Sequence, residues 1–536
     1  MPRNLEREVK RRRCFAIISH PDAGKTTMTE KLLLYGGAIR SAGAVKARKA
    51  AMHATSDWME IEKQRGISVT SSVMQFEYDG YCVNILDTPG HQDFSEDTYR
   101  TLCAADAAVM MIDAGRGVEK QTIKLFEVCH MRGIPIFTFI NKMDRAAKSP
   151  FDLMDELEKV LGIRSAPINW PIGTHGDFKG VYDREKSCIE LFDRESGAHG
   201  SKQVEVIQVS LDDPHLADYI GSSYVDDLNA DIELLDIAGD PFDLEAFRAG
   251  QITPMFFGSA LTNFGVESFL RYFLDWAPAP GPRKAETGEV DPIADDFSAF
   301  VFKIQANMNP AHRDRLAFIR ICSGVFEKNM EVSLGSERKK IRLTQPQQFM
   351  AQEHKVLEEA YPGDIIGLFD PGVFRIGDSL YAGNSAKIYG DIPIFPPEHF
   401  ARIEVKDSMK RKQFIRGMEQ LSQEGAVQLY KQEGIGTETY TVGVVGVLQL
   451  DVLSYRLENE YKAEIVRTDL PYRYARWIDF EEGKTIDLDD LVLTSTCMLV
   501  RDRYQRPVLL FESPWAIDWV LERNKGMILQ TIAEAK

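Results

Sequence analysis

One segment constrains the fold of this chain more than any other, the octapeptide Ser19-His20-Pro21-Asp22-Ala23-Gly24-Lys25-Thr26. It follows an apolar run at 14–18 that is typical of a buried strand, and it precedes a helical pattern that ends at a glycine pair. A strand, a glycine-containing loop and a helix in this order predict a phosphate-binding P-loop, although Ser19 replaces the first glycine of the usual pattern. Residues 19–27, which end at Thr27, are therefore expected to bind phosphate through backbone amides and the helix N-terminus. Lys25 would supply a cation for the β- and γ-phosphates, and Thr26 a hydroxyl ligand for Mg²⁺.

A second motif, Asp87-Thr88-Pro89-Gly90-His91, ends another predicted strand. An aspartate at this place can hold Mg²⁺, usually through water, and Gly90 can present its N–H to a γ-phosphate because no side chain blocks the approach. The alternative is an ordinary turn. An acidic Mg²⁺ ligand is what the first motif lacks, so the two motifs complement each other.

A third motif, Asn141-Lys142-Met143-Asp144, selects the base. A carboxylate at Asp144 can accept two hydrogen bonds from the N1–H and N2–H₂ edge of guanine, and adenine offers no such pair of donors. Asn141 would tie this loop to the P-loop, and the stem of Lys142 would cover one face of the base. After a further strand, the backbone of Ser259-Ala260-Leu261 would donate to guanine O6. The cofactors predicted are GTP or GDP with Mg²⁺.

The pattern of apolar and polar residues changes twice along the chain, which predicts three domains. Residues 1–280 alternate short apolar runs with helical patterns, as in a mostly parallel α/β sheet, with an acidic, irregular insertion at about 165–250. The proline-rich stretch at 277–282 reads as a stiff linker. Residues 290–392 then predict a β-barrel, and residues 395–536 an α+β sandwich. The fold class is thus a multidomain protein with a P-loop domain.

Composition removes several classes of protein. The net charge is −17, with 81 acidic and 64 basic side chains, which argues against bulk coating of nucleic acid. The apolar runs are short and interrupted by charge, so no membrane span is expected. The seven cysteines are scattered, which fits a reducing cytoplasm better than a disulfide framework or a zinc site.

With these motifs in place, the first 280 residues resemble the nucleotide domain of the translational GTPases, the family of elongation factors Tu and G. Arg65-Gly66-Ile67-Ser68 matches the first switch of that family, with Ser68 where the family usually has threonine. The resemblance implies that Ser68 is a further Mg²⁺ ligand. Thr70 is a substitute for it, and a solvated loop serine is the alternative. The resemblance also implies that His91 orients the attacking water, whereas a lone histidine elsewhere is usually structural.

Four longer strings are similar to the class II peptide-chain release factors of bacteria. They are residues 15–22, 56–60, 93–100 and 443–451. The resemblance implies a ribosome-dependent GTPase that helps to remove class I release factors after peptide release. The implied catalytic set is His91, Lys25, Asp22 and Gly90, the implied partners are rRNA, ribosomal proteins and class I factors, and a monomer is expected. The Gly-Gly-Gln tripeptide of class I factors is missing from the chain.

Basic side chains gather in four places where rRNA contacts are conceivable. Each could equally be a solvated charged face. They are residues 38–53; Arg313, Arg315 and Arg320; Arg338, Lys339, Lys340 and Arg342; and Lys406, Lys410, Arg411, Lys412 and Arg416.

Two other functions compete with this one. The first is another ribosome-associated GTPase, such as a translocase-like, ribosome-protection or assembly factor, against which the four strings and a length shorter than that of elongation factor G argue. The second is a regulatory protein that holds GTP as a structural ligand, against which the intact second motif and His91 argue.

Overall fold

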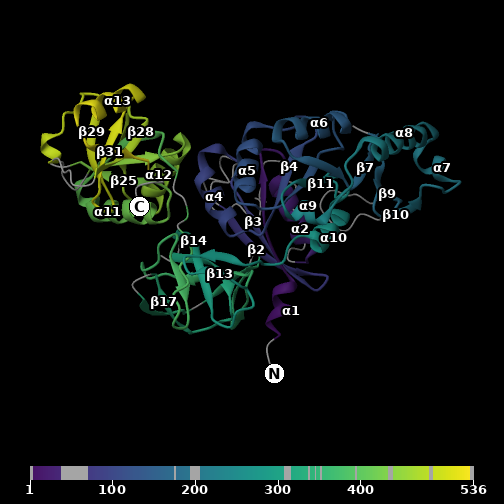
Figure 1. Cartoon of the computed structure of the whole chain (residues 1–536), viewed down its shortest axis with the longest axis horizontal. Helices are drawn as coiled ribbons and strands as arrows, with labels where there is room; N and C mark the ends of the chain where they lie inside the picture. The colour runs from purple at the N-terminus through teal and green to yellow at the C-terminus, as the bar shows by residue number, and fades with distance from the viewer. Residues whose placement is uncertain are drawn as a thin grey trace.

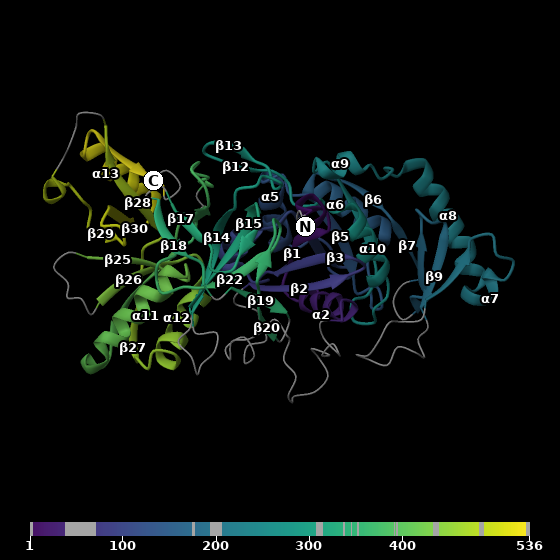
Figure 2. The same ribbon diagram turned by 90° about the horizontal axis from the view of Figure 1, so that it is seen from below.

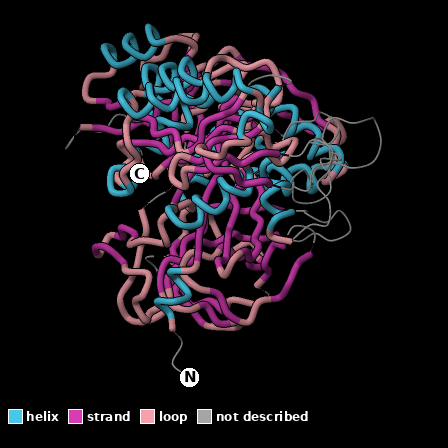
Figure 3. The backbone as a smooth tube through the Cα atoms, turned by 90° about the vertical axis from the view of Figure 1, so that its right-hand side faces the viewer, coloured by secondary structure: helices cyan, strands magenta, loops and turns pink. Residues whose placement is uncertain are grey.

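The computed structural model describes residues 4–37, 71–173, 177–192, 206–306, 315–335, 338–344, 346–350, 353–390, 392, 395–432, 439–481 and 487–531. These residues form three successive bodies (Figure 1), and the predicted multidomain fold class is confirmed. When the molecule is seen along its long direction, most helices lie in its upper part, and its lower part consists mainly of strands and loops (Figure 3). In the described part of the chain, none of the helices combines the length and apolarity that crossing a bilayer requires.

The first body is built on a seven-stranded sheet in the order β2-β3-β1-β4-β5-β11-β6. Neighbouring strands run parallel except in the β2–β3 hairpin, which turns at Asp79 and Gly80, both with positive φ. Its strands are β1 (Arg12–Ser19), β2 (Ser72–Tyr78), β3 (Tyr81–Asp87), β4 (Ala107–Asp113), β5 (Ile136–Asn141), β6 (Arg164–Pro167) and β11 (Ile252–Phe257). Its helices are α1 (Leu5–Lys10), α2 (Lys25–Tyr35), η1 (Gln92–Phe94), α4 (Ser95–Cys103), α5 (Lys120–Met131), α6 (Pro150–Leu161), α9 (Leu244–Arg248) and α10 (Val266–Trp276).

Both faces of this sheet are buried, so β1 is apolar on both sides. Ala16 and Ile18 face a core shared with α4, α5 and α6, while Phe15 and Ile17 face a core shared with α2 and α10. This double burial explains why the strand reads as a continuous apolar run instead of an alternating one. The carboxyl ends of β1, β3, β4 and β5 therefore meet at one edge, where ligands bind in open α/β sheets.

The inserted segment is more regular than the sequence suggested. Its strands form a separate antiparallel sheet in the order β10-β9-β8-β7, and the indole N–H of Trp170 donates to Asp231 of α8 at 2.9 Å. The elements are β7 (Asn169–Ile172), β8 (Gly180–Asp183), β9 (Cys188–Phe192), β10 (Val206–Ser210), α7 (Leu216–Ile220) and α8 (Ser222–Ala238). The acidic side chains that gave the irregular appearance lie largely on the exposed face of α8. The insertion lies at the end of the molecule opposite the third body (Figure 2).

The second body is an antiparallel sheet of eight strands around its own apolar core, in the order β18-β17-β23-β14-β15-β22-β19-β20. Two short two-stranded sheets, β12-β13 and β16-β21, accompany it. The strands are β12 (Arg283–Ala285), β13 (Gly288–Val290), β14 (Ser298–Ala306), β15 (Arg315–Ser323), β16 (Phe326–Glu327), β17 (Glu331–Leu334), β18 (Lys339–Arg342), β19 (Gln347–Met350), β20 (Glu353–Val356), β21 (Glu359–Ala360), β22 (Ile365–Phe369) and β23 (Ser379–Tyr381).

The third body is a sheet in the order β27-β24-β26-β25-β29-β30-β28-β31 with helices packed on it. The segment after residue 480 continues this sheet through β29, β30 and β31. The elements are β24 (His399–Val405), η3 (Ser408–Lys410), α11 (Arg411–Gln423), β25 (Gln428–Lys431), β26 (Thr439–Val444), α12 (Val447–Asn459), β27 (Ile465–Leu470), β28 (Tyr474–Phe480), η4 (Leu488–Asp490), β29 (Cys497–Asp502), β30 (Pro507–Phe511), α13 (Pro514–Arg523) and β31 (Met527–Gln530).

Buried ion pairs join the first two bodies. Arg12 pairs with Asp364 at 2.9 Å, and Asp106 accepts from Arg283 at 3.0 Å and from Arg320. Burial opposes the charged form of Arg320, but Asp106 outweighs it and raises the pKa of the guanidinium. Buried charges of this kind are costly unless paired, so these contacts fix how the two bodies meet.

These contacts correct one expectation about RNA binding. Arg315 and Arg320 are buried, and Arg315 pairs with Asp370 at 2.6 Å, so neither presents a free charge to RNA phosphates. Arg313 lies outside the described residues. The other two clusters in the second and third bodies are largely exposed and stay candidates.

Candidate nucleotide site

The P-loop begins where β1 ends and leads directly into α2. Asp22 and Gly24 both have positive φ, of 66° and 100°, and Ala23 N–H closes a turn to the carbonyl of His20 at 3.3 Å. Gly24 is the N-cap residue of α2 and has no side chain with which to accept from the first helical turn. The N–H groups of that turn, including those near Thr26 and Thr27, therefore point toward the loop, as a phosphate-binding helix end requires.

Asn141, at the end of β5, joins the P-loop to the loop after β11. Its Nδ2 donates to the carbonyl of Ala23 at 2.8 Å, and its Oδ1 accepts from the N–H of Ala260 at 2.9 Å. A Cβ on Gly24 would lie 2.2 Å from Nδ2 of Asn141. Glycine at position 24 thus serves two purposes: it adopts the left-handed backbone and makes room for Asn141.

Lys142 also contacts the P-loop. Its Nζ donates to the carbonyl of Asp22 at 2.5 Å and to the carboxylate of Asp113 at 2.6 Å. Burial of Asp113 opposes its ionisation, but the hydrogen bonds from Lys142 and from the N–H of Gly115 outweigh burial and lower the pKa of this carboxyl. The ammonium end is fixed, so the methylene stem of Lys142 is stretched between the base loop and the P-loop.

Asp144 has the properties expected of a base-recognising carboxylate. Met143 before it is fully buried and donates its N–H to the carbonyl of Gly258 at 3.1 Å, which anchors the loop. Oδ1 of Asp144 is buried and has no hydrogen-bond partner among the described residues. A buried acceptor without a donor is costly in a folded protein, and the N–H edge of a guanine would satisfy it.

Two backbone amides of the segment 259–261 are hydrogen-bonded within the protein. Ser259 N–H donates to the carbonyl of Phe264 at 2.9 Å, and Ala260 N–H is held by Asn141. Asn141 uses both ends of its side-chain amide to join the two loops, so the N–H of Ala260 already has a hydrogen-bond partner within the protein. Of the three residues, Leu261 is partly exposed, and its backbone N–H is the one that would contact a base.

Lys25 and Asp87 meet across the phosphate end of the site. They form a buried ion pair between Nζ and Oδ1, while Oδ2 of Asp87 is buried without a partner among the described residues. In the described ranges, no three His, Cys, Asp or Glu side chains lie close enough together to hold a metal ion by themselves. A divalent cation held by Asp87 and Thr26 would therefore complete its shell with phosphate oxygens and water, which suits Mg²⁺.

The second motif packs against the first. Oγ1 of Thr88 donates to the carbonyl of Ile17 at 2.7 Å, and Oγ1 of Thr98 donates to the carbonyl of Pro89 at 3.3 Å. A Cβ on Gly90 would stand 3.4 Å from Cα of Pro21, so the backbones of the two loops are adjacent. His91 follows with a partly exposed ring whose Nδ1 lies 3.3 Å from Oδ1 of Asp93.

Several expected residues lie outside the described part of the chain. They are Arg65, Gly66, Ile67, Ser68 and Thr70, together with the basic segment 38–53 and the string 56–60. The metal role of Ser68 therefore stays a prediction.

Three carboxylates near the site were not predicted from the sequence. Asp113 fixes Lys142, Glu119 lies 3.3 Å from Nε2 of His20, and Asp93 contacts His91. Asp113 could have been found, because it ends a buried strand as Asp87 and Asn141 do, and such strand ends share one edge of the sheet. Asp93 lies in the three-residue helix η1 and Glu119 is the N-cap residue of α5, and neither lies in a segment long enough to show periodicity.

Family models match along nearly the whole chain. Residues 10–279 match the elongation factor Tu GTP binding domain, residues 296–383 match elongation factor G domain 2, and residues 389–521 match the class II release factor RF3 C-terminal domain. Among solved structures, the crystal structure of ttk003000868 from Thermus thermophilus has a TM-score of 0.68 at 22% identity, covering 88% of this chain and 71% of that chain. This likeness concerns the fold alone.

Curated relatives are similar over their full length. Peptide chain release factor 3 of Symbiobacterium thermophilum is 58% identical, with 99% of this chain and 100% of the relative covered. The protein of the same name from Listeria innocua is 52% identical with the same coverage, and that from Cyanothece is 53% identical over 99% of this chain and 96% of the relative. Together with the GTP-binding and C-terminal family matches, these identities show that the chain belongs to the peptide chain release factor 3 family and is a GTPase of translation termination.

Proposed function

We propose that this GTPase acts on the ribosome after peptide release, where its guanine-nucleotide cycle promotes the departure of class I release factors. Membership of this family already makes the chain a GTPase of translation termination. The C-terminal family match at 389–521 favours this role over a translocase-like, ribosome-protection or assembly factor.

The observation that carries the proposal is the position of α4, the helix that follows the phosphate-side loop. Arg100 of α4 donates to the carbonyls of Glu424 and Gly425 in the third body, at 3.1 and 2.8 Å. Asp97 of the same helix lies 3.9 Å from Nζ of Lys303 in the second body. A rearrangement of the loop at Gly90 would thus reach both other bodies through one rigid helix.

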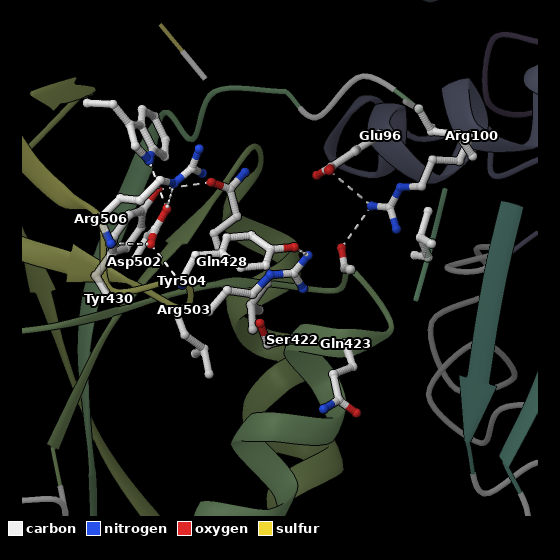
Figure 4. A pocket seen from close by; sticks show the side chains of 16 residues that line it. Glu96, Arg100, Ser422, Gln423, Gln428, Tyr430, Asp502, Arg503, Tyr504 and Arg506 are labelled. Atoms are coloured by element: carbon white, nitrogen blue, oxygen red, sulfur yellow. Dashed lines mark hydrogen bonds and ion pairs between the residues drawn. The ribbon is translucent and has the colours of Figure 1, made fainter. Parts of the chain in front are cut away.

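Figure 4 shows the same helix beside the third body, with Glu96 and Arg100 opposite Tyr430, Asp502 and Arg506 across a cavity of about 100 Å³. Polar and apolar side chains line this cavity, so α4 and the third body pack together less completely than the residues of a domain core do. Such an interface is suited to opening and closing, in contrast to the buried ion pairs that join the first two bodies.

We assign the following chemistry to the site. The P-loop amides and Lys25 would bind the phosphates, with Asp22 in the loop and the N–H of Gly90 at the γ-phosphate. Thr26, Ser68 and Asp87 would hold Mg²⁺, which neutralises phosphate charge when bound. Asp144 would read guanine. His91 would orient the attacking water, and the ribosome would supply in trans the group that activates hydrolysis.

Contacts with rRNA and ribosomal proteins are assigned to the exposed basic clusters at 338–342 and 406–416. A chain of net charge −17 would associate through such local faces and dissociate readily. We place the protein in the cytoplasm, as a monomer.

The proposal is tested with GTP turnover on termination complexes that carry a bound class I factor. The wild-type chain should hydrolyse GTP much faster with ribosomes than without, and should increase the number of complexes that each class I factor serves. His91→Ala should retain GTP binding and lose the stimulated hydrolysis. Unchanged stimulated turnover in His91→Ala would remove the catalytic role of His91, and unchanged recycling by the wild-type chain would remove the termination role.

A further inference from the structure

One carboxylate connects the nucleotide site with the third body. Oδ1 of Asp93 lies 3.3 Å from Nδ1 of His91, and Oδ2 of the same carboxylate accepts from the backbone N–H of Leu448 at 2.7 Å. Asp93 is mostly buried and belongs to η1, just ahead of α4, whereas Leu448 belongs to α12 in the third body. The two bonds therefore cross from the catalytic loop to a different domain through a single side chain.

The contact with Leu448 acts as a helix cap supplied from another domain. Helix α12 begins at Val447 after Gly446, and glycine offers no side chain to accept from the N–H groups of the first turn. Leu448 is the second residue of that helix, which is a position that a capping carboxylate normally serves. An anion at a helix N-terminus is also favoured by the helix dipole. The third body therefore contributes one of the bonds that position the carboxylate of Asp93.

Gly446 is required for this approach. A Cβ on Gly446 would fall 2.2 Å from Cγ and 2.4 Å from Cα of Asp93. The backbone of Gly446 has φ of −129° and ψ of 150°, which any residue adopts. Gly446→Ala would therefore leave the backbone of the third body unstrained and force Asp93 away from α12.

The imidazole of His91 has two competing partners in Asp93. The backbone N–H of Asp93 approaches Nδ1 at 3.3 Å, and the carboxylate Oδ1 approaches the same atom at 3.3 Å. An N–H donor needs a ring nitrogen with a free lone pair, whereas a carboxylate needs one that carries a proton. The place of the carboxylate thus decides which ring nitrogen holds the proton.

We propose that Asp93 is a positioning residue through which the seating of the third body sets the tautomer of His91. This inference rests on the proposed role of His91. With α12 seated, the carboxylate keeps the proton on Nδ1 and leaves the Nε2 lone pair free to accept from water. With α12 displaced, the N–H of Asp93 takes Nδ1, and the proton resides on Nε2, which then no longer accepts from water.

The first test uses the full-length, nucleotide-free protein labelled with ¹⁵N-histidine. Long-range ¹H–¹⁵N spectra report which ring nitrogen carries the proton, and the His91 signals are assigned by their loss in His91→Gln. Gly446→Ala should shift His91 from the Nδ1-protonated toward the Nε2-protonated form. The control is Gly390→Ala, because a Cβ there meets nothing within 4 Å. His91 signals identical in wild type and Gly446→Ala would overturn the inference.

The second test separates charge from seating. Asp93→Asn keeps an oxygen to accept from Leu448 but removes the negative charge beside Nδ1, so it should leave thermal stability near wild type and still shift the His91 signals. On ribosomes, Gly446→Ala and Asp93→Asn should each lower the kcat of stimulated hydrolysis by about tenfold, with KM for GTP near wild type. A role of Asp93 as a cap alone predicts lower stability in Asp93→Ala and unmoved His91 signals in Asp93→Asn, which would also overturn the inference.

The outcomes for the two proposals are distinct. If His91→Ala keeps its stimulated hydrolysis, the proposed function loses its catalytic residue even when Gly446→Ala moves the His91 signals. If His91→Ala is inactive but those signals do not move, the inference about Asp93 is wrong and the proposed function stands.

Discussion

The ammonium group of Lys25 forms an ion pair with the carboxylate of Asp87 across the two loops that face the phosphates, and both side chains are almost completely buried. A bound nucleotide must compete for this pair, because the same ammonium is the cation expected at the β- and γ-phosphates. The pair joins the two loops, and binding of phosphate by Lys25 is expected to compete with it.

Removing the carboxylate should expose this competition. Asp87→Asn leaves a buried ammonium without its counter-charge, which costs roughly 3–5 kcal/mol of stability in comparable buried pairs. Saturating GDP should restore much of the loss, because a phosphate then becomes the partner of Lys25. The measurement is thermal unfolding with and without GDP, with Asp226→Asn on the exposed face of α8 as the control. A loss of stability that GDP leaves unchanged would contradict this account.

The buried, unpartnered Oδ1 of Asp144 gives a prediction about the base. Asp144→Asn replaces an acceptor by a donor, which matches the carbonyl O2 of xanthine better than the amino group of guanine. Hydrogen bonds to a charged group are worth about 1.5–3 kcal/mol, so GTP affinity should fall by roughly ten- to a hundredfold while affinity for xanthosine triphosphate rises. Competition with a fluorescent GDP analogue measures both. Intact GTP affinity in Asp144→Asn would remove the assignment.

Gly24 should tolerate no side chain, for a reason that can be separated from its backbone conformation. Gly24→Ala meets both a φ of 100° and a contact of 2.2 Å with Nδ2 of Asn141. Gly37 has φ of 67° and nothing within 4 Å of its would-be Cβ, so Gly37→Ala reports a backbone cost of roughly 1–2 kcal/mol without a steric contact. We expect Gly24→Ala to abolish GDP binding in calorimetry and Gly37→Ala to bind like wild type. Equal affinities would show that the Asn141 contact is dispensable.

The sequence predicted well what depends on neighbours along the chain. The strand–loop–helix order around Gly24 follows from a local pattern, and the structure contains it. The sequence failed where a partner lies far away. Arg320 looked like a surface charge because its partner Asp106 is 214 residues distant, and the link from Asp93 to Leu448 spans 355 residues. Charge and periodicity carry no information about such pairs.

The buried cysteines give a chemical check of the packing in the first two bodies. Burial raises the pKa of Cys14, Cys82 and Cys129 to about 12, and it also raises that of Cys103 and Cys322. The thiolate is the reactive form, so these five should resist a maleimide in the native protein. Cys497 and Cys188 are partly exposed and should react, with Cys188 slower because burial and nearby carboxylates raise its pKa. Mass spectrometry before and after denaturation counts the labels, and rapid native labelling of any of the five would contradict the packing.

Glu96 of α4 provides a pH test of the contact between the first and third bodies. Burial raises the pKa of this carboxyl, although Arg100, whose NH2 lies 3.2 Å from it, acts in the opposite direction. Because the folded pKa exceeds the unfolded one, the folded state holds more protons between the two values. The contribution of Glu96 to the free energy of unfolding therefore falls as pH rises above about 4.3.

Glu96→Gln removes this titration, so the Tm of the wild type relative to that of Glu96→Gln should decrease as pH rises from about 4.5 to about 7. Glu233→Gln on α8 is the exposed control and should show a constant difference. A Tm difference that increases with pH would mean that Arg100 stabilises the charged carboxylate more than burial destabilises it, and a flat difference would mean that the two effects cancel. Either result would contradict the prediction.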